Sequence, residues 1–391
     1  MRGPRGGREP RPQGRDGHSR RDRGTGGPRR ARSPGRGRPR PAPNPLSPLP
    51  TRSAVRALSR IALTLALTLT GCTDAPHRAA PKNSATATVA PRSPQAVELP
   101  GNSWPAELAV APDGTVWTAE SSLGFLASIS PDGRITQHRL ADALHAPSLD
   151  PTYLAVASDG SVWFTCPNHV GRLAPDGKVS LFDGPVMGPG SPDAITAGAD
   201  GSVWYGSASV DASQLTHLTP SLSATRVPVP LAPFAPHVTS LTFGPGGRLW
   251  FAESPITDQP SEIGYVDTGG HPKVWLLPTA ATPVGSLVPG PDGALWFSET
   301  NAIGRITPSG AISSYRTGAM RYVRSVIAGP DQALWFTTDT AVGRITTAGV
   351  ITLWPLPGAQ GLADLVYDSR HRGFLIADAK AAVLRWFPMP A

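Results

Sequence analysis

The chain has 391 residues, with 42 glycines, 45 prolines, ten tryptophans and only 16% charged side chains. Its formal charge of +8 comes from the N-terminal part, because 17 of the 36 basic residues but only three of the 28 acidic residues precede Cys72. The rest of the chain is mildly acidic, which argues against a nucleic-acid partner. Two cysteines do not indicate a disulfide framework, and the abundant glycine, proline and tryptophan fit an all-β protein with many turns.

Residues 1–50 consist mainly of Arg, Gly, Pro and Ser, a composition that cannot bury a core and predicts a disordered leader. Residues 51–71 have the pattern of an export signal, with three arginines followed by the apolar segment Ile61–Leu69, which is too short to span a bilayer. Because the signal comes after the leader, the leader is either a basic arm or the result of a start that was assigned too early.

The signal ends in Leu-Thr-Gly-Cys at Leu69–Cys72, which resembles a bacterial lipobox, where the cysteine is lipidated and becomes the first mature residue. The alternative is a plain secretory signal with an incidental cysteine. The lipobox interpretation predicts an exported lipoprotein on the outer face of the cytoplasmic membrane, anchored through Cys72. Residues 72–94 are rich in Ala, Pro, Ser and Thr without apolar periodicity, and we expect them to be a flexible tether.

The stretch GPDGALWFSETNAIGRITPSG, residues 290–310, contains two β-hairpins in miniature. Turns rich in Pro, Asp and Gly flank two runs that suit strands, Ala294–Glu299 and Ala302–Thr307. The unit recurs along the chain, with an aromatic residue marking each copy: Trp117, Trp163, Trp204, Trp250, Trp296, Trp335 and Phe374. The steps of 46, 41, 46, 46, 39 and 39 residues match the period of a four-stranded propeller blade.

Seven markers predict a seven-bladed β-propeller of four-stranded blades over residues 95–391. In the second unit the expected strands are Thr152–Ser158, Ser161–Cys166, His169–Pro175 and Lys178–Asp183. The last unit is one strand short, whereas residues 95–100 resemble the fourth strand of the other units. We therefore expect this N-terminal strand to complete the last blade and close the ring, which leaves no raw edge between the first and last blades.

Several recurrent residues have a structural interpretation. The Asp-Gly turns offer one carboxylate each, whereas a calcium loop needs several oxygen ligands, so we expect these aspartates to shape turns. Glu120, Glu253 and Glu299 follow the tryptophan strand in three units, which favours a shared structural hydrogen bond. Cys166 ends a strand and is expected to be a buried, unreactive thiol. The histidines His138, His145, His169, His217, His271 and His371 show no metal-ligand spacing.

The repeat, together with its relatives AVGRITTAG and HVGRLAPDG, resembles that of the streptogramin B lyase (virginiamycin B lyase) family of seven-bladed propellers. The resemblance covers residues 95–391. It implies a lyase that opens the ester-closed ring of a cyclic depsipeptide antibiotic by elimination, with Mg²⁺. Such a reaction needs a base that removes a proton α to a carbonyl and a cation that stabilises the developing charge.

The resemblance also implies where these groups lie: in Pro-His pairs at the inner-strand heads of the last two blades and in a Glu after the aromatic marker of the last blade. The matching strand heads here are approximately Ala106, Thr152, Asp193, His237, Val284, Val323 and Ala363. Only Pro236-His237 keeps the pair, in the fourth unit, and Val323 and Ala363 replace the two histidines. Asp378 occupies the place of the Glu. The catalytic candidates are therefore His237 and Asp378.

Strand heads of neighbouring blades converge on one mouth of the axial channel. Tyr153, Asp193 and His237 are accordingly the candidate ligand-binding residues, with Glu107 beside them, although a lone histidine such as His237 can also be purely structural.

Two functions remain open. One is a binding propeller that holds a small molecule, a peptide or an envelope component at the channel mouth, with the family's catalysis lost or weakened. The other is a divergent Mg²⁺-dependent lyase. Export and the two missing histidines favour binding. We expect a monomer whose partners are this ligand and the membrane, with Mg²⁺ needed only if the protein is catalytic.

Overall fold

The computed structural model describes residues 87–88, 96–99, 104–121, 124–140, 150–182, 192–208, 213–229, 237–254, 259–267, 269–280, 283–318 and 322–390. The chain divides into two units, Met1–Arg78 and Ala79–Ala391, and every described residue belongs to the second. The expected leader, export signal and lipidation site Cys72 lie outside the described residues. Within those residues, no helix has the length and apolarity needed to cross a bilayer.

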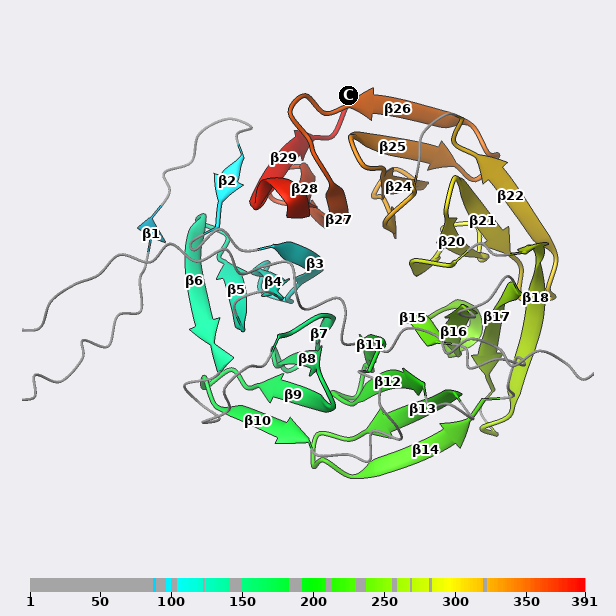
Figure 1. The fold of residues 1–391 in the computed structure, drawn as a ribbon, viewed down its shortest axis with the longest axis horizontal. Helices are drawn as coiled ribbons and strands as arrows, with labels where there is room; N and C mark the ends of the chain where they lie inside the picture. The colour runs from blue at the N-terminus through cyan, green and yellow to red at the C-terminus, as the bar shows by residue number, and fades with distance from the viewer. Residues whose placement is uncertain are drawn as a thin grey trace, which may run out of the picture. The chain divides into compact units, whose positions relative to one another are not determined.

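The second unit is a ring of seven antiparallel sheets, which confirms the predicted seven-bladed propeller (Figure 1). In each blade the first strand lies nearest the axis and the last lies outermost. The first four blades contain β3 (Pro105–Val110), β4 (Val116–Glu120), β5 (Phe125–Ile129) and β6 (Arg134–Arg139); β7 (Leu154–Val156), β8 (Val162–Cys166), β9 (His169–Leu173) and β10 (Val179–Phe182); β11 (Ala194–Ala197), β12 (Val203–Ala208), β13 (Ser213–Leu218) and β14 (Ala224–Pro228); β15 (His237–Phe243), β16 (Leu249–Ser254), β17 (Pro260–Val266) and β18 (Pro272–Ala280).

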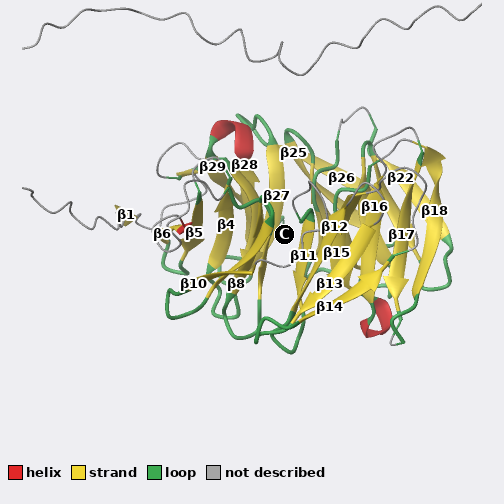
Figure 2. Cartoon of the chain, turned by 60° about the horizontal axis from the view of Figure 1, so that its bottom comes forward, coloured by secondary structure: helices red, strands yellow, loops and turns green. Residues whose placement is uncertain are grey.

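The last three blades have the same order. They contain β19 (Leu287–Pro289), β20 (Leu295–Glu299), β21 (Ala302–Ile306) and β22 (Ile312–Arg316); β23 (Val326–Ala328), β24 (Ala333–Thr337), β25 (Ala341–Thr346) and β26 (Ile351–Pro355); β27 (Leu362–Asp368), β28 (Gly373–Asp378), β29 (Val383–Pro388) and β2 (Val97–Glu98). Two short 3-10 turns, η2 (Pro245–Gly247) and η3 (Ala379–Ala381), connect strands of blades 4 and 7 (Figure 2).

The N-terminal strand closes the ring, as the sequence predicts. Strand β2 pairs antiparallel with β29, with Val97 opposite Leu384 and Glu98 opposite Val383. The next residue, Leu99, is buried in a cluster that also contains Leu384. The seventh blade is therefore built from both ends of the propeller, so the outer edge of β29 is covered rather than exposed.

The expected tether is not free of the propeller along its whole length. Ala87 and Thr88, inside residues 72–94, form strand β1 and pair with Ile135 and Arg134 of β6. The physical reason is that β6 is the outermost strand of blade 1 and presents unpaired backbone groups that a passing segment can hydrogen-bond. At these two residues the segment therefore contacts blade 1.

In two blades, the aspartate of the turn before the tryptophan strand accepts a hydrogen bond from that tryptophan. In blade 5, Asp292 accepts hydrogen bonds from Trp296 Nε1 at 3.0 Å and from Arg305 Nε at 2.7 Å. Asp331 of blade 6 does the same for Trp335 and Arg344, at 3.0 and 2.6 Å. Burial would raise the pKa of both aspartates, but these hydrogen bonds outweigh it and hold each pKa below the ordinary value.

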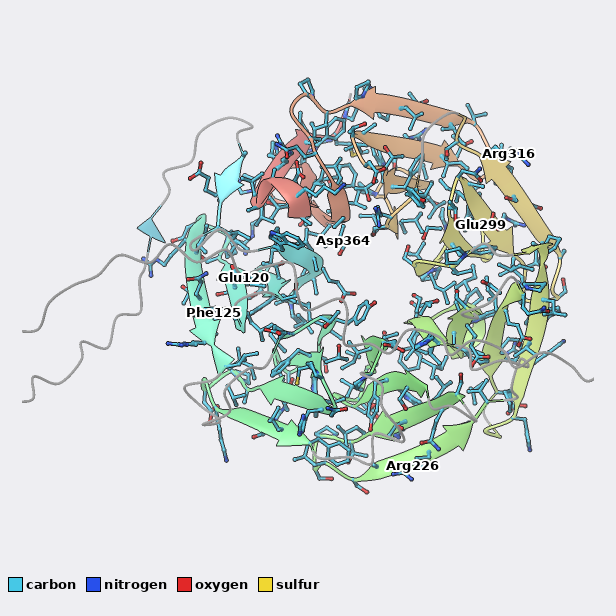
Figure 3. The ribbon with its side chains drawn as sticks, in the orientation of Figure 1. Glu120, Phe125, Arg226, Glu299, Arg316 and Asp364 are labelled. Atoms are coloured by element: carbon cyan, nitrogen blue, oxygen red, sulfur yellow. The ribbon has the colours of Figure 1, made fainter. Side chains whose placement is uncertain are left out.

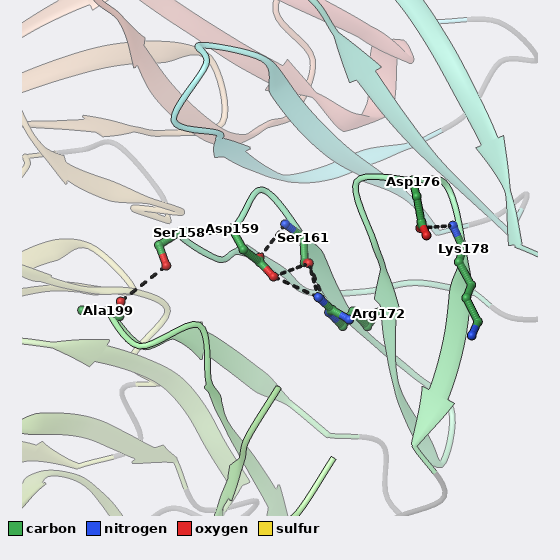
Figure 4. A network of polar contacts seen from close by, with 7 residues as sticks. All are labelled: Ser158, Asp159, Ser161, Arg172, Asp176, Lys178 and Ala199. Carbon is green, nitrogen blue, oxygen red and sulfur yellow. Dashed lines mark hydrogen bonds and ion pairs between the residues drawn. The ribbon is translucent and has the colours of Figure 1, made fainter. Parts of the chain in front are cut away.

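Blade 2 uses a variant of this arrangement (Figure 4). Asp159 accepts from the backbone N–H and the hydroxyl of Ser161, at 2.8 and 2.9 Å, and from Arg172 Nη2 at 2.9 Å. These aspartates thus shape turns, in agreement with the sequence interpretation.

A second recurrent contact explains why the third strand of the repeat has a glycine. The phenylalanine after the tryptophan lies directly over a glycine of the third strand, so a Cβ on Gly304 would come within 2.0 Å of the Phe297 ring and one on Gly343 within 2.1 Å of the Phe336 ring. The rings are fully buried between blades. A larger residue than glycine at these positions would displace the ring from the core.

Candidate functional site

The inner-strand heads bring together Asp193 and His237 from blades 3 and 4. His237 begins β15, and Asp193 directly precedes β11. Their side chains meet across the junction, with 2.7 Å between His237 Nδ1 and Asp193 Oδ2. The His237 side chain remains 40% exposed. Because a carboxylate accepts at Nδ1, the pairing fixes the ring orientation and leaves Nε2 as the nitrogen for another partner.

Tyr153 of blade 2 belongs to the same group of side chains. Burial, followed by the negative charges of Glu107 and Asp193, raises the pKa of its hydroxyl to about 12. The tyrosine therefore stays protonated and can donate a hydrogen bond throughout the physiological range. The structure thus gathers the three sequence-predicted ligand residues, Tyr153, Asp193 and His237, in three consecutive blades.

Two further acids lie on the innermost strands of blades 1 and 7. Glu107 Oε2 accepts the backbone N–H of Leu154 at 2.8 Å, and Asp364 Oδ2 accepts that of Leu108 at 2.8 Å. Burial raises the pKa of both, and the charge of Asp364 raises that of Glu107 further. Figure 3 shows Asp364 at the inner edge of the ring, facing the axis.

These acids also connect neighbouring blades, because each accepts a backbone N–H of the next blade. The same junction is made in blades 4 and 5 by neutral side chains: Ser240 Oγ accepts from Leu287 N at 3.1 Å, and Ser286 Oγ accepts from Val326 N at 3.0 Å. Inner-strand side chains therefore tie successive blades together around the axis. In blades 7 and 1 these ties to a backbone N–H are made by carboxylates, Asp364 and Glu107.

Asp364 was missed by counting back from the aromatic markers, which gives Ala363 for blade 7. The count marks the strand head, whereas Asp364 lies one residue further along, ten residues before Phe374, at the same offset as Glu107 from Trp117. The available signal was the residue type, since an aspartate inside the otherwise apolar strand Leu362–Val366 needs a polar partner.

The chain matches the Virginiamycin B lyase family over residues 94–360. The protein belongs to this family. Virginiamycin B lyase from Nocardia farcinica is 32% identical over 147 residues, which are 37% of this chain and 48% of that protein, so the chain spans about half the length of this relative.

Solved structures of the family have the same fold. A streptogramin B lyase structure matches with a TM-score of 0.65 and 25% identity, covering 75% of this chain and 96% of that one. Virginiamycin B lyase from Staphylococcus aureus matches with a TM-score of 0.66 and 25% identity, covering 76% and 99%. A catalytically inactive histidine-to-alanine variant of that enzyme with quinupristin gives a TM-score of 0.67, also at 25% identity, with 76% and 99% covered.

At the two strand heads where the resemblance implies histidines, this chain has the apolar residues Val323 and Ala363. Val323 is buried in an apolar cluster with Val326 and Leu334, and Ala363 packs against another. An alkyl side chain can neither remove a proton nor bind a metal ion.

Asp378, at the place of the family's Glu, is fully engaged. Its side chain is completely buried and accepts from Arg385 Nε at 2.7 Å and from the backbone N–H groups of Gly361 and Gln360, at 2.9 and 3.1 Å. It also caps η3. These donors hold the carboxylate to the turn before β27, so its geometry is that of a structural anchor.

The residues present do not fit the family's Mg²⁺. The two histidine positions offer no ligand, and the oxygens of Asp378 are occupied by an arginine and backbone donors. In the described part of the chain, no group of three or more His, Cys, Asp or Glu side chains is arranged to hold a metal ion.

Proposed function

We propose that this member of the virginiamycin B lyase family is an exported lipoprotein whose propeller binds a small molecule, a peptide or an envelope component at the channel mouth, with little or no lyase activity. The observation that carries the proposal is the hydrogen bond between His237 and Asp193. It orients a partly exposed imidazole at a strand head, two blades away from where the family places its site.

The neighbouring groups support hydrogen bonding to a ligand. Tyr153 supplies a hydroxyl donor, His237 has one ring nitrogen beyond the Asp193 contact, and Asp193 carries a negative charge. A few convergent polar groups at the mouth of a scaffold are typical of sites that fix the orientation of a small ligand.

The family's elimination reaction is expected to be weak because its base is missing at the positions of Val323 and Ala363. Loss of a general base typically costs about two to four orders of magnitude in rate.

The test uses quinupristin, the compound present with the inactive S. aureus enzyme. The purified chain is incubated with quinupristin and Mg²⁺, and the products are separated by chromatography before mass spectrometry, because elimination opens the ring without changing the mass. We expect no efficient ring opening. Titration calorimetry with the same compound then measures binding, which His237→Ala should weaken and Asp378→Asn should leave unchanged if the variant folds.

The second candidate function is a divergent lyase, favoured by family membership and by the oriented imidazole of His237. Rapid ring opening that is lost in His237→Ala would support it, with His237 as a relocated base. Rapid ring opening that is lost in Asp378→Asn but kept in His237→Ala would instead show that the family's site survives in residues other than those identified here. Either result overturns the binding proposal.

The membrane anchor is a separate part of the proposal. Lipidation of Cys72 would bury acyl chains worth about 0.8 kcal/mol per CH₂, and several chains anchor a protein stably. Fractionation of cells that express the full chain should place it in the membrane, and Cys72→Ala should release it. Recovery of peptides from residues 1–50 in the mature protein, or release of the unaltered protein without detergent, would contradict this part.

A further inference from the structure

Blade 4 contains a pair of buried glutamates that lack the outer-strand hydrogen-bond donor found in two other blades. Glu253 of β16 lies directly opposite Glu262 of β17. Glu253 is fully buried and Glu262 is 7% exposed. Neither oxygen of Glu253, nor Oε2 of Glu262, has a hydrogen-bond partner among the described residues.

The same position in two other blades shows what is missing. Glu120 of blade 1 accepts from Gln137 Nε2 at 2.7 Å, and Glu299 of blade 5 accepts from Ser314 Oγ at 2.6 Å. Both donors come from the outermost strand of the blade, where blade 4 has the apolar Val274 opposite Gly264. The expected shared hydrogen bond therefore exists in two of the three blades, and Glu253 lacks it.

The pair faces the junction between blades 3 and 4. Val238, which is paired with Glu253, packs so closely on blade 3 that a Cβ on Gly206 would lie 2.4 Å from it. Residues opposite each other in an antiparallel sheet share a face, so both glutamates point the same way. The influence of Ser213, on β13, on the Glu253 carboxyl agrees with this placement.

No basic group compensates these acids. Burial raises the pKa of Glu253 to about 7, Ser213 offsets this in part, and the charge of Glu262 adds to the rise. Burial also raises the pKa of Glu262. Among the described residues, no lysine, arginine or histidine is among the causes that set either pKa, so no basic group offsets the charge of these carboxylates when they are ionised.

We propose that Glu253 and Glu262 bind one hard divalent cation, Mg²⁺ or Ca²⁺, at the junction of blades 3 and 4. A buried charge without a partner is too costly to keep, so an ion or a proton must balance it. Carboxylate oxygens suit hard cations, and Mg²⁺ is commonly held by only one or two carboxylates. The site lies in blade 4 and is separate from the family's positions in the last two blades. It does not depend on the function proposed above.

The test compares thermal unfolding of the purified chain in EDTA with unfolding in millimolar Mg²⁺ or Ca²⁺. At a pH of about 8, where protons compete little with the cation, one of these ions should raise the melting temperature by several degrees. At a pH of about 6 the rise should be smaller, because the pair then holds protons. Glu253→Gln and Glu262→Gln should abolish the rise.

Glu299→Gln is the matched control, because Glu299 occupies the same place in blade 5 but has Ser314 as a donor, and this variant should keep the full cation effect. A cation effect that persists in Glu253→Gln, or no cation effect in the unaltered chain, overturns the proposal; in the second case the pair holds only a proton. If Glu253→Gln does not fold, titration calorimetry of the EDTA-treated unaltered chain decides, since the proposal requires one binding event per chain and the absence of heat contradicts it.

Discussion

Blades 5 and 6 follow the repeat closely, whereas blade 4 departs from it at several positions. In blades 5 and 6 an aspartate binds both the tryptophan and an arginine. In blade 4 the equivalent residue is Gly246, and the buried Nε1 of Trp250 has no partner. Blade 4 also contains the pair of unpartnered glutamates and begins with His237, which contacts the neighbouring blade.

The difference between these blades distinguishes residues that serve the stability of the fold from residues that serve function. Blades 5 and 6 satisfy their buried polar groups locally, so their sequence serves the fold. Blade 4 leaves polar groups unsatisfied and places a histidine at the mouth, and such departures from a local rule are expected at sites selected for function.

The largest effect should come from removing the strand that closes the ring. Deletion of residues 95–100 exposes the edge of β29 and removes Leu99, which is 4% exposed. The loss should exceed the roughly 3 kcal/mol typical of a leucine truncation in a core. Thermal or urea unfolding measures it. Deletion of residues 73–83, which precede the first described strand, is the control and should change stability little; equal losses would show that β2 is not a closing strand.

The second effect tests whether blade 5 can be made to resemble blade 4. Asp292→Ala leaves Trp296 Nε1 without an acceptor, which is the state of Trp250 Nε1 in blade 4. The same change removes the ion pair of Arg305. A buried donor left unpaired costs about 1–3 kcal/mol, and the lost turn contacts add to this. Urea unfolding should show a loss in the free energy of unfolding near the upper end of this range.

The control for this change is Asp176→Ala in blade 2, where the exposed carboxylate only accepts the N–H of Lys178 at 3.0 Å. It should cost less than about 1 kcal/mol. Equal losses for both variants would mean that the tryptophan and arginine contacts add nothing to the turn itself.

The fold was predictable from the sequence because each blade repeats the same local solution. Turn glycines, the tryptophan strands and the missing fourth strand of the last unit together specified seven blades and their closure. Sites depend instead on which inner-strand side chains meet across blades, and a count to the strand head stops one residue before the side chain that makes the contact. This is why Asp364 was missed, and why the lack of a donor for Glu253 was invisible until its cross-strand neighbours were known.

The third effect is a pH dependence that blade 4 should show and blade 5 should not. The pKa of Glu253 is raised to about 7 in the folded chain, above its value in an unfolded one. The folded state therefore binds more protons, so stability in cation-free buffer should be full below a pH of about 4.5 and should fall as the pH rises through about 7.

A shift of this size corresponds to roughly 3 kcal/mol. Unfolding in EDTA across this range measures it. Glu253→Gln should flatten the curve, whereas Glu299→Gln should leave it unchanged. A curve that keeps its slope in Glu253→Gln would assign the titration to other acids, such as Glu107.

The smallest effect distinguishes blades 5 and 6 from each other. At the turn before the tryptophan strand, blade 5 has Gly293 with φ of 72° and blade 6 has Gln332 with φ of 57°. A residue with a Cβ pays roughly 1–2 kcal/mol in this left-handed region, whereas glycine pays part of that in the flexibility it loses on folding. Gln332→Gly should therefore stabilise the protein by roughly 0.5–1 kcal/mol, and Gly293→Gln should destabilise it by a similar amount. Urea unfolding of both variants measures the pair. Because Gln332 is exposed, a neutral or negative result for Gln332→Gly would mean that backbone strain at this turn is relieved elsewhere in blade 6, and that the two most regular blades do not share one local energetic solution.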